Sequence, residues 1–126
     1  MYIVKVTKKK EKDVSIMTAF QEKMIIKGFN EILNYEVGGW LNELQDYEEY
    51  TEEDFKERVT HDNLMKTLDY ELKEAYKRGY LEVDSFSGHI IEAKHIKFLG
   101  KAKIQELMTV AVLTMLADDD VKSIIG

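Results

Sequence analysis

The sequence predicts a mostly helical α+β fold, arranged as a single domain over residues 1–126. Apolar residues recur at three- and four-residue spacing near both ends of the chain, which predicts long N- and C-terminal helices. Between them, residues 80–98 alternate apolar and polar positions around the turn Ser85-Phe86-Ser87-Gly88. This alternation predicts a β-hairpin at 80–98. A chain of this length can bury a core without disulfides or structural metals, and it contains no cysteine.

The N-terminal third is expected to hold a strand, a loop and a helix. Tyr2, Val4 and Val6 alternate with their neighbours, which predicts a short N-terminal strand, and Lys8–Asp13 is expected to form an exposed loop. A helix over residues 15–46 should follow, capped by Ser15 or Thr18. Its predicted buried stripe comprises Met17, Phe20, Met24, Ile25, Phe29, Ile32 and Leu33. Gly38-Gly39 interrupts that stripe, so we expect a kink there or two helices that meet.

Two further helices are expected before the hairpin. Thr51 followed by Glu52, Glu53 and Asp54 is typical of a helix start, because a threonine cap precedes acids that favour the positive end of the helix dipole. A second helix over 62–78 is indicated by an apolar face and by capping oxygens at its start. The residues of that face are Leu64, Met65, Leu68, Leu72, Ala75 and Tyr76; the capping residues are Thr60, Asp62 and Asn63. Gly79 is expected to end it in a left-handed conformation.

The C-terminal helix, residues 101–117, is apolar around most of its circumference. Such a helix needs cover on most sides, so we expect it to pack both on the 15–46 helix and on a second copy of the chain. The expected assembly is therefore a homodimer through 15–46 and 101–117. The run Asp118-Asp119-Asp120 is expected to cap a last short helix that buries Val121, Ile124 and Ile125.

The order of elements from 51 to 117, with a helix at 62–78 followed by a hairpin and the stretch HIKFLGKAKIQEL, resembles the winged-helix domain of small bacterial or phage regulators. The resemblance implies that 62–78 is a recognition helix and 80–98 a wing, and hence a dimeric DNA-binding transcriptional regulator. The DNA-binding residues that it implies are Asn63, Lys66, Thr67, Tyr70, Lys73, Lys77, Ser85, Ser87 and His89.

The charge distribution favours a protein partner over DNA. Residues 31–60 hold ten acids against two bases, whereas 62–78 carries equal numbers of acids and bases. Duplex binding requires a basic footprint, which the helix 62–78 lacks. The preferred interpretation is a small acidic interaction module, a phage-type inhibitor or adaptor that binds a basic host protein. The expected partner-binding residues are Tyr47, Glu48, Glu49, Tyr50, Glu52 and Glu53.

Several classes of function find no support in the sequence. No nucleotide-binding, nucleophile or metalloprotease motif is present, so we expect neither enzymatic activity nor a cofactor. His89 and His95 would lie about 20 Å apart on an extended strand, so no metal site is expected. No apolar run is long enough to cross a bilayer, and no signal pattern is present, which predicts a cytoplasmic protein without a membrane partner.

Overall fold

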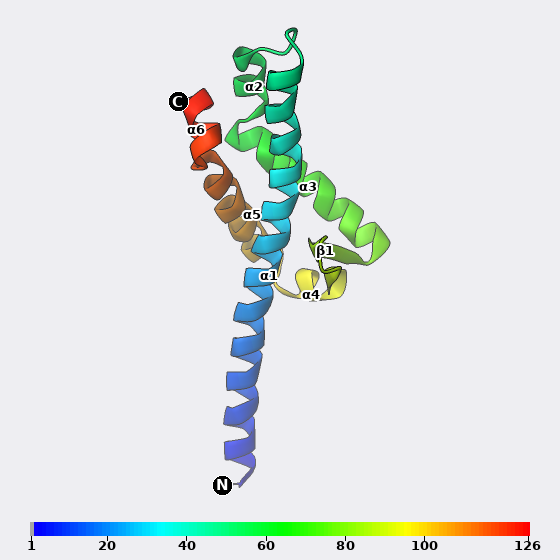
Figure 1. Ribbon diagram of the computed structural model, residues 1–126. Coiled ribbons are helices and arrows are strands. Elements are labelled where there is room, and N and C mark those ends of the chain that lie inside the picture. The colour runs from blue at the N-terminus through cyan, green and yellow to red at the C-terminus, as the bar shows by residue number, and fades with distance from the viewer. Residues whose placement is uncertain (1) are drawn as a thin grey trace.

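The computed structural model describes the backbone of residues 2–126 and the side chains of residues 19–126. Six helices and one two-stranded antiparallel sheet follow one another along this part of the chain (Figure 1). They are α1 (Tyr2–Asp46), α2 (Glu52–Arg58), α3 (His61–Arg78), β1 (Tyr80–Asp84), β2 (His89–Glu92), α4 (Ala93–Phe98), α5 (Lys101–Leu116) and α6 (Asp119–Ile125). The predicted mostly helical α+β class, with long helices near both ends, is confirmed.

Helix α1 replaces the predicted N-terminal strand, the predicted loop at Lys8–Asp13 and the predicted cap at Ser15 or Thr18, so these three expectations are wrong. The alternation over residues 2–7 is short, and the lysine-rich run after it consists of good helix formers. No glycine or proline stands between Met1 and Gly28 to stop the helix. Local propensity and an uninterrupted run therefore favour a single helix.

The predicted kink at Gly38-Gly39 is also wrong, because α1 continues through both glycines to Asp46. Val37 is buried beside them, and Trp40 and Leu44 pack partly against the same core. Packing on both sides of the glycine pair keeps the helix continuous, although two glycines cost roughly 2 kcal/mol of helix stability relative to alanine.

The predicted helix start after Thr51 and the predicted helix end at Gly79 are confirmed, and α3 begins at His61, one residue before its predicted start. The Thr51 hydroxyl accepts the N–H of Asp54, and the Asp54 carboxylate accepts the N–H of Thr51, which forms a capping box at the start of α2. Thr60 caps α3 by accepting the N–H of Asn63. Gly79 closes α3 with φ of 94°, a conformation that glycine adopts without steric cost. These caps fix where α3 passes into β1.

The β-hairpin is shorter than predicted, since β2 ends at Glu92 and residues 93–98 form α4. Leu81 pairs with Ile91, and Tyr80 pairs with Glu92 at the open end. Ile96 is fully buried whereas Phe98 is 78% exposed. On a strand, Ile96 and Phe98 would lie on the same face. In α4 the buried residues are instead Ala93 and Ile96, which are three residues apart as on one face of a helix, so Phe98 points to solvent.

The core lies where α1, α3 and α5 meet, with β1 packed on the side of α1 (Figure 1). Phe29 and Leu33 of α1, Leu68 of α3 and Met108 of α5 are all essentially inaccessible to solvent. The apolar face of α5 predicted from the sequence is buried against α1 and α3.

At the other end of the molecule α6 packs beside α2. The predicted cap at Asp118 is confirmed, because its carboxylate accepts the N–H groups of Asp120 and Val121.

Candidate interaction groove

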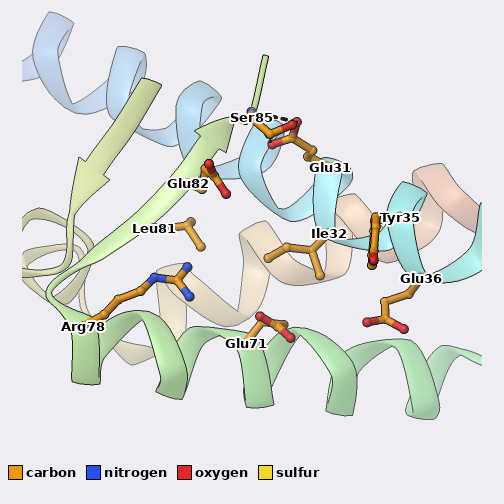
Figure 2. A pocket seen from close by; sticks show the side chains of 9 residues that line it. All are labelled: Glu31, Ile32, Tyr35, Glu36, Glu71, Arg78, Leu81, Glu82 and Ser85. Carbon is orange, nitrogen blue, oxygen red and sulfur yellow. Dashed lines mark hydrogen bonds between the residues drawn. The ribbon is translucent and has the colours of Figure 1, made fainter. Parts of the chain in front are cut away.

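A groove of about 390 Å³ lies between α1, α3 and β1 (Figure 2). We call it the acidic groove. Its lining residues are Glu31, Ile32, Tyr35 and Glu36 of α1, Glu71 and Arg78 of α3, Leu81 and Glu82 of β1, and Ser85 at the hairpin tip. Four carboxylates therefore converge on one hollow that holds a single guanidinium. Among residues 19–126, no other charged side chain lines it.

Each element contributes its part of the groove for a simple geometric reason. Glu71 and Arg78 are seven residues apart on α3, so they lie on one face about 10 Å apart along the axis. Alternation along β1 buries Leu81 completely and leaves Glu82 exposed. Ile32 thus supplies an apolar floor that the buried Leu81 backs from below, with carboxylates around it.

Glu31 is the one groove carboxylate that is satisfied by the protein itself. It accepts the Ser85 hydroxyl at 2.7 Å and the Ser85 N–H at 2.9 Å, which attaches the hairpin tip to α1 (Figure 2). Among the described side chains, Glu36, Glu71 and Glu82 take part in no ion pair. These three carboxylates are available to a ligand.

Arg78 is held at the edge of the groove by its own neighbours. Its Nε donates to the Tyr80 carbonyl oxygen at 2.9 Å, and its guanidinium lies 5.1 Å from the centroid of the Tyr80 ring. Arg78 forms no ion pair with Glu71 of the same helix, and Figure 2 shows the Glu36 side chain reaching toward the groove from α1. The excess negative charge of the groove is consequently not neutralised from within.

The acidic segment singled out in the sequence lies elsewhere, at the connection between α1 and α2 (Figure 1). Tyr47, Glu48 and Glu49 are exposed there, and Glu52 and Glu53 occupy the exposed first turn of α2. Glu53 forms an ion pair with Lys56 at 3.4 Å. The acidic groove includes none of these residues.

Tyr50 does not project as an anchor for a partner. It packs partly against the core, and its hydroxyl is buried without a hydrogen-bond partner among the described residues. The Arg58 guanidinium lies 4.9 Å from the Tyr50 ring centroid and 5.7 Å from that of Trp40, and it reaches Glu43 at 3.4 Å. Burial raises the pKa of the Tyr50 hydroxyl, so it stays protonated and neutral.

Most of the DNA-binding residues that the winged-helix resemblance implies are bonded to other residues of the protein. Asn63 donates through Nδ2 to the Glu57 carbonyl oxygen, and Thr67 donates to the Asn63 carbonyl oxygen. Lys73 and Lys77 form ion pairs with Asp69 and Glu74 on the same helix. Lys66 and Tyr70 are exposed on α3, Ser85 is bound to Glu31, and Ser87 and His89 lie at the exposed hairpin end.

Sequence reasoning missed the acidic groove because its carboxylates come from three separated elements. Glu31 and Glu36 belong to the acid-rich stretch 31–60, which was a usable signal. Glu71 is followed two residues later by Lys73, and Glu82 stands between the apolar Leu81 and Val83, so neither gave such a signal. Only the packing of α1 beside β1, across from α3, brings the four together.

Other site types find no support in the described part of the chain. Its His, Asp and Glu side chains form no group of three or more that could hold a metal ion, and His95 lies on α4 rather than on a strand. No helix within the described residues has the length and apolar character needed to span a membrane. Comparisons with protein-family models, with curated proteins and with solved structures each give no match.

Proposed function

We propose that this protein is a small interaction module that binds a basic segment of a partner protein in the acidic groove. The observation that carries the proposal is the convergence of Glu31, Glu36, Glu71 and Glu82 on one hollow above an apolar floor. Such a site suits lysine and arginine side chains, because the floor contacts their aliphatic stems while the carboxylates meet their charged ends.

The shape of the site supports a peptide segment rather than a flat protein surface. A volume of about 390 Å³ accommodates a few side chains. Tyr35, whose side chain is 82% exposed, stands at the rim, where an aromatic ring can stack on a guanidinium or cover a lysine stem. The hairpin tip is fixed to α1 through Ser85, so the groove is largely formed before a partner arrives.

This proposal keeps the acidic protein-interaction function expected from the sequence and relocates its centre from residues 47–53 to the groove. An inhibitor or adaptor that occupies the basic surface of a host protein, as a phage protein does, remains the biological role that it fits. The acidic connection between α1 and α2 then adds to the long-range attraction of a basic partner, without providing the specific contacts.

The winged-helix alternative is less well supported. Two of the four cations on α3 are paired with acids of the same helix, Lys73 with Asp69 at 3.0 Å and Lys77 with Glu74 at 3.3 Å. A protein that binds duplex DNA must neutralise several phosphates, and its face needs a surplus of positive charge. DNA binding is therefore one of the outcomes that the binding experiment described next distinguishes.

The test measures binding of three fluorescent probes of similar length by anisotropy: a lysine- and arginine-containing peptide, an acidic peptide and a short DNA duplex. We expect the basic peptide alone to bind, with an affinity that falls as salt is raised. The triple variant Glu36→Gln, Glu71→Gln and Glu82→Gln should weaken binding about tenfold, as expected from roughly 0.5 kcal/mol for each exposed charge. Binding of the duplex, or of both peptides equally, would contradict the proposal.

A further inference from the structure

A second hollow, of about 530 Å³, lies between α1, β2 and α4. We call it the edge hollow. Its lining residues are Phe20, Gln21 and Met24 of α1, Ile90, Ile91 and Glu92 of β2, and His95 of α4. None of them lines the acidic groove, which takes its hairpin residues from β1 and the tip. The edge hollow and the acidic groove are therefore separate surfaces.

The strand β2 borders the edge hollow with an unpaired edge. Within the described backbone the sheet has two strands, so β2 has a neighbour on one side only. The N–H of Ala93 donates to the Gly79 carbonyl oxygen, so Ala93 and Ile91 direct their backbone groups toward β1. Ile90 and Glu92 direct theirs to the opposite edge, because successive residues of a strand alternate in this respect. The N–H groups of Ile90 and Glu92 have no backbone partner within residues 2–126, so they can bind an added strand.

Exposed apolar side chains stand on both faces of this edge. Ile91 pairs with Leu81, and both are buried on the face of the sheet that packs on α1. On that side α1 presents Phe20, which is 62% exposed, whereas Met24 packs partly against the core. Ile90 lies on the opposite face and is 46% exposed. A strand added beside β2 would cover Phe20 with side chains of one face and Ile90 with those of the other.

The edge carries positive charge at the end nearest the hairpin tip. A smaller hollow of about 260 Å³ shares Phe20 with the edge hollow, and Lys23, Lys27 and His89 line it as well. Lys27 is already paired with Asp84 at 3.4 Å. Lys23 is exposed and forms no ion pair with a side chain of residues 19–126. It is therefore the lysine available to a ligand at this end.

We infer that the edge hollow binds an extended segment of a partner protein, which adds a third strand to the sheet beside β2. Hydrogen bonds to the N–H groups of Ile90 and Glu92 require an extended backbone. The side chains of the segment are apolar where they meet Phe20 and Ile90, and a carboxylate at its end complements Lys23. An antiparallel segment, the more stable arrangement, carries this carboxylate at its C-terminal end, near His89. The inference does not depend on the acidic groove, which suits a ligand of opposite charge.

A second copy of this chain matches the edge less well. The one acid of β2, Glu92, is already paired with Lys94 at 3.1 Å, so a second β2 offers Lys23 no unpaired carboxylate. The apolar face of α5, through which the sequence predicted self-association, is buried within the chain. The expected occupant is accordingly a segment of another protein.

The first measurement tests the charge at the end of the segment. The probe is a fluorescent peptide of about eight residues that alternates valine and threonine and ends in two glutamates. Its valines distinguish it from a purely acidic peptide. We expect it to bind about threefold more tightly than the same peptide ending in two glutamines, and Lys23→Gln should remove this difference. Lys66→Gln, an exposed change on α3, should preserve it. A difference that persists in Lys23→Gln, or no binding of either peptide up to about 1 mM, overturns the inference.

Hydrogen exchange measured by NMR shows whether the bound peptide forms a strand. The amides of Ile90 and Glu92 should exchange at least about tenfold more slowly with saturating peptide, whereas Ile91, whose amide already faces β1, should change little. Phe20→Ala should weaken binding about fivefold, because the peptide covers this ring. Tyr35→Ala, which alters a more exposed ring of α1, is the control and should leave the affinity unchanged. Unaltered exchange at Ile90 and Glu92, or equal losses of affinity in the two variants, would show that no strand is added at this edge.

The same amides separate a partner segment from a second copy of the chain. Without peptide, the exchange rates of Ile90 and Glu92 should not depend on protein concentration up to about 100 µM. Protection that rises with protein concentration would contradict the inference, because the second copy would then occupy the edge.

Discussion

Gly28 lies at a close approach between α1 and β1. A Cβ placed on it would stand 3.0 Å from the Glu82 carbonyl oxygen and 3.2 Å from Leu81 Cδ2. The backbone oxygen cannot move aside as a flexible side chain would, so the absence of a side chain at this position sets the distance between helix and strand. That distance in turn fixes the width of the acidic groove, because Glu31 and Glu82 belong to the two elements in contact.

We therefore predict that Gly28→Ala destabilises the protein, by roughly 1–3 kcal/mol, since overpacking outweighs the gain in helix propensity. Gly39→Ala is the matched control on the same helix, with nothing within 4 Å of its added methyl group. It should stabilise the protein by up to about 1 kcal/mol. Urea denaturation of the two variants measures both effects, and equal shifts of the same sign would contradict the close approach.

The Asp54 carboxylate gives the stability a defined dependence on pH. The N–H and the hydroxyl of Thr51 donate to it and hold its pKa below the ordinary value of 3.8. As the pH falls through 3.8, Asp54 therefore binds a proton in the unfolded chain before it does so in the folded protein. The contribution of Asp54 to the free energy of unfolding is complete above this pH and is lost as the pH drops toward the lower pKa of the folded state.

The corresponding prediction concerns the slope of stability with pH. Asp54→Asn should lower the free energy of unfolding at neutral pH and should flatten its decline below about pH 4, because the titrating group is gone. Glu49→Gln, on the exposed connection before α2, serves as the control and should leave the slope unchanged. Urea denaturation from pH 7 to pH 3 measures the slope; an unaltered acid limb in Asp54→Asn would argue against the capping carboxylate as its source.

At the scale of elements, the hairpin is attached to α1 at two points near its tip. Lys27 reaches Asp84 at 3.4 Å, and Glu31 accepts from the hydroxyl and the N–H of Ser85. The pKa of Asp84 lies below its ordinary value, chiefly because the N–H of Ser87 donates to its carboxylate. The tip is thus a structured turn held on a helix, which is what keeps one wall of the groove in place.

Glu31→Ala should consequently loosen the hairpin, at a cost of about 1 kcal/mol for the hydrogen bonds lost. Glu36→Ala, which removes a carboxylate of the same groove that makes no bond to the hairpin, is the control. Hydrogen exchange of the amides of β1 and β2, at a protein concentration where the chain is monomeric, distinguishes the two variants. Faster exchange in both, or in neither, would be inconsistent with an anchoring role for Glu31.

Elements whose ends carry local signals were the ones that the sequence predicted well. Thr51, Thr60, Gly79 and Asp118 all mark helix ends through their own side chains or conformation, and each does so in the structure. The errors fall where the signal was periodicity over few residues. Six alternating residues after Met1 are equally compatible with a helix, and residues 93–98 fit both periods until the burial of Ile96 decides between them.

At the scale of the whole molecule, the site was harder to predict than the fold. The acid-rich stretch 31–60 pointed to a basic partner, but it drew attention to residues 47–53, which are close in sequence and exposed on a connection. The groove assembles Glu36, Glu71 and Glu82 from α1, α3 and β1. Their proximity follows from the packing of α1 on β1 at Gly28, a tertiary contact that no local pattern encodes.

The most direct measurement of the central claim compares two variants that remove equal charge from different places. One carries Glu36→Gln, Glu71→Gln and Glu82→Gln in the groove; the other carries Glu48→Gln, Glu49→Gln and Glu53→Gln at the connection between α1 and α2. Affinity for the same basic peptide at one salt concentration should fall about tenfold in the first and less than about threefold in the second. Equal losses, or a larger loss in the second variant, would show that the groove does not hold the partner.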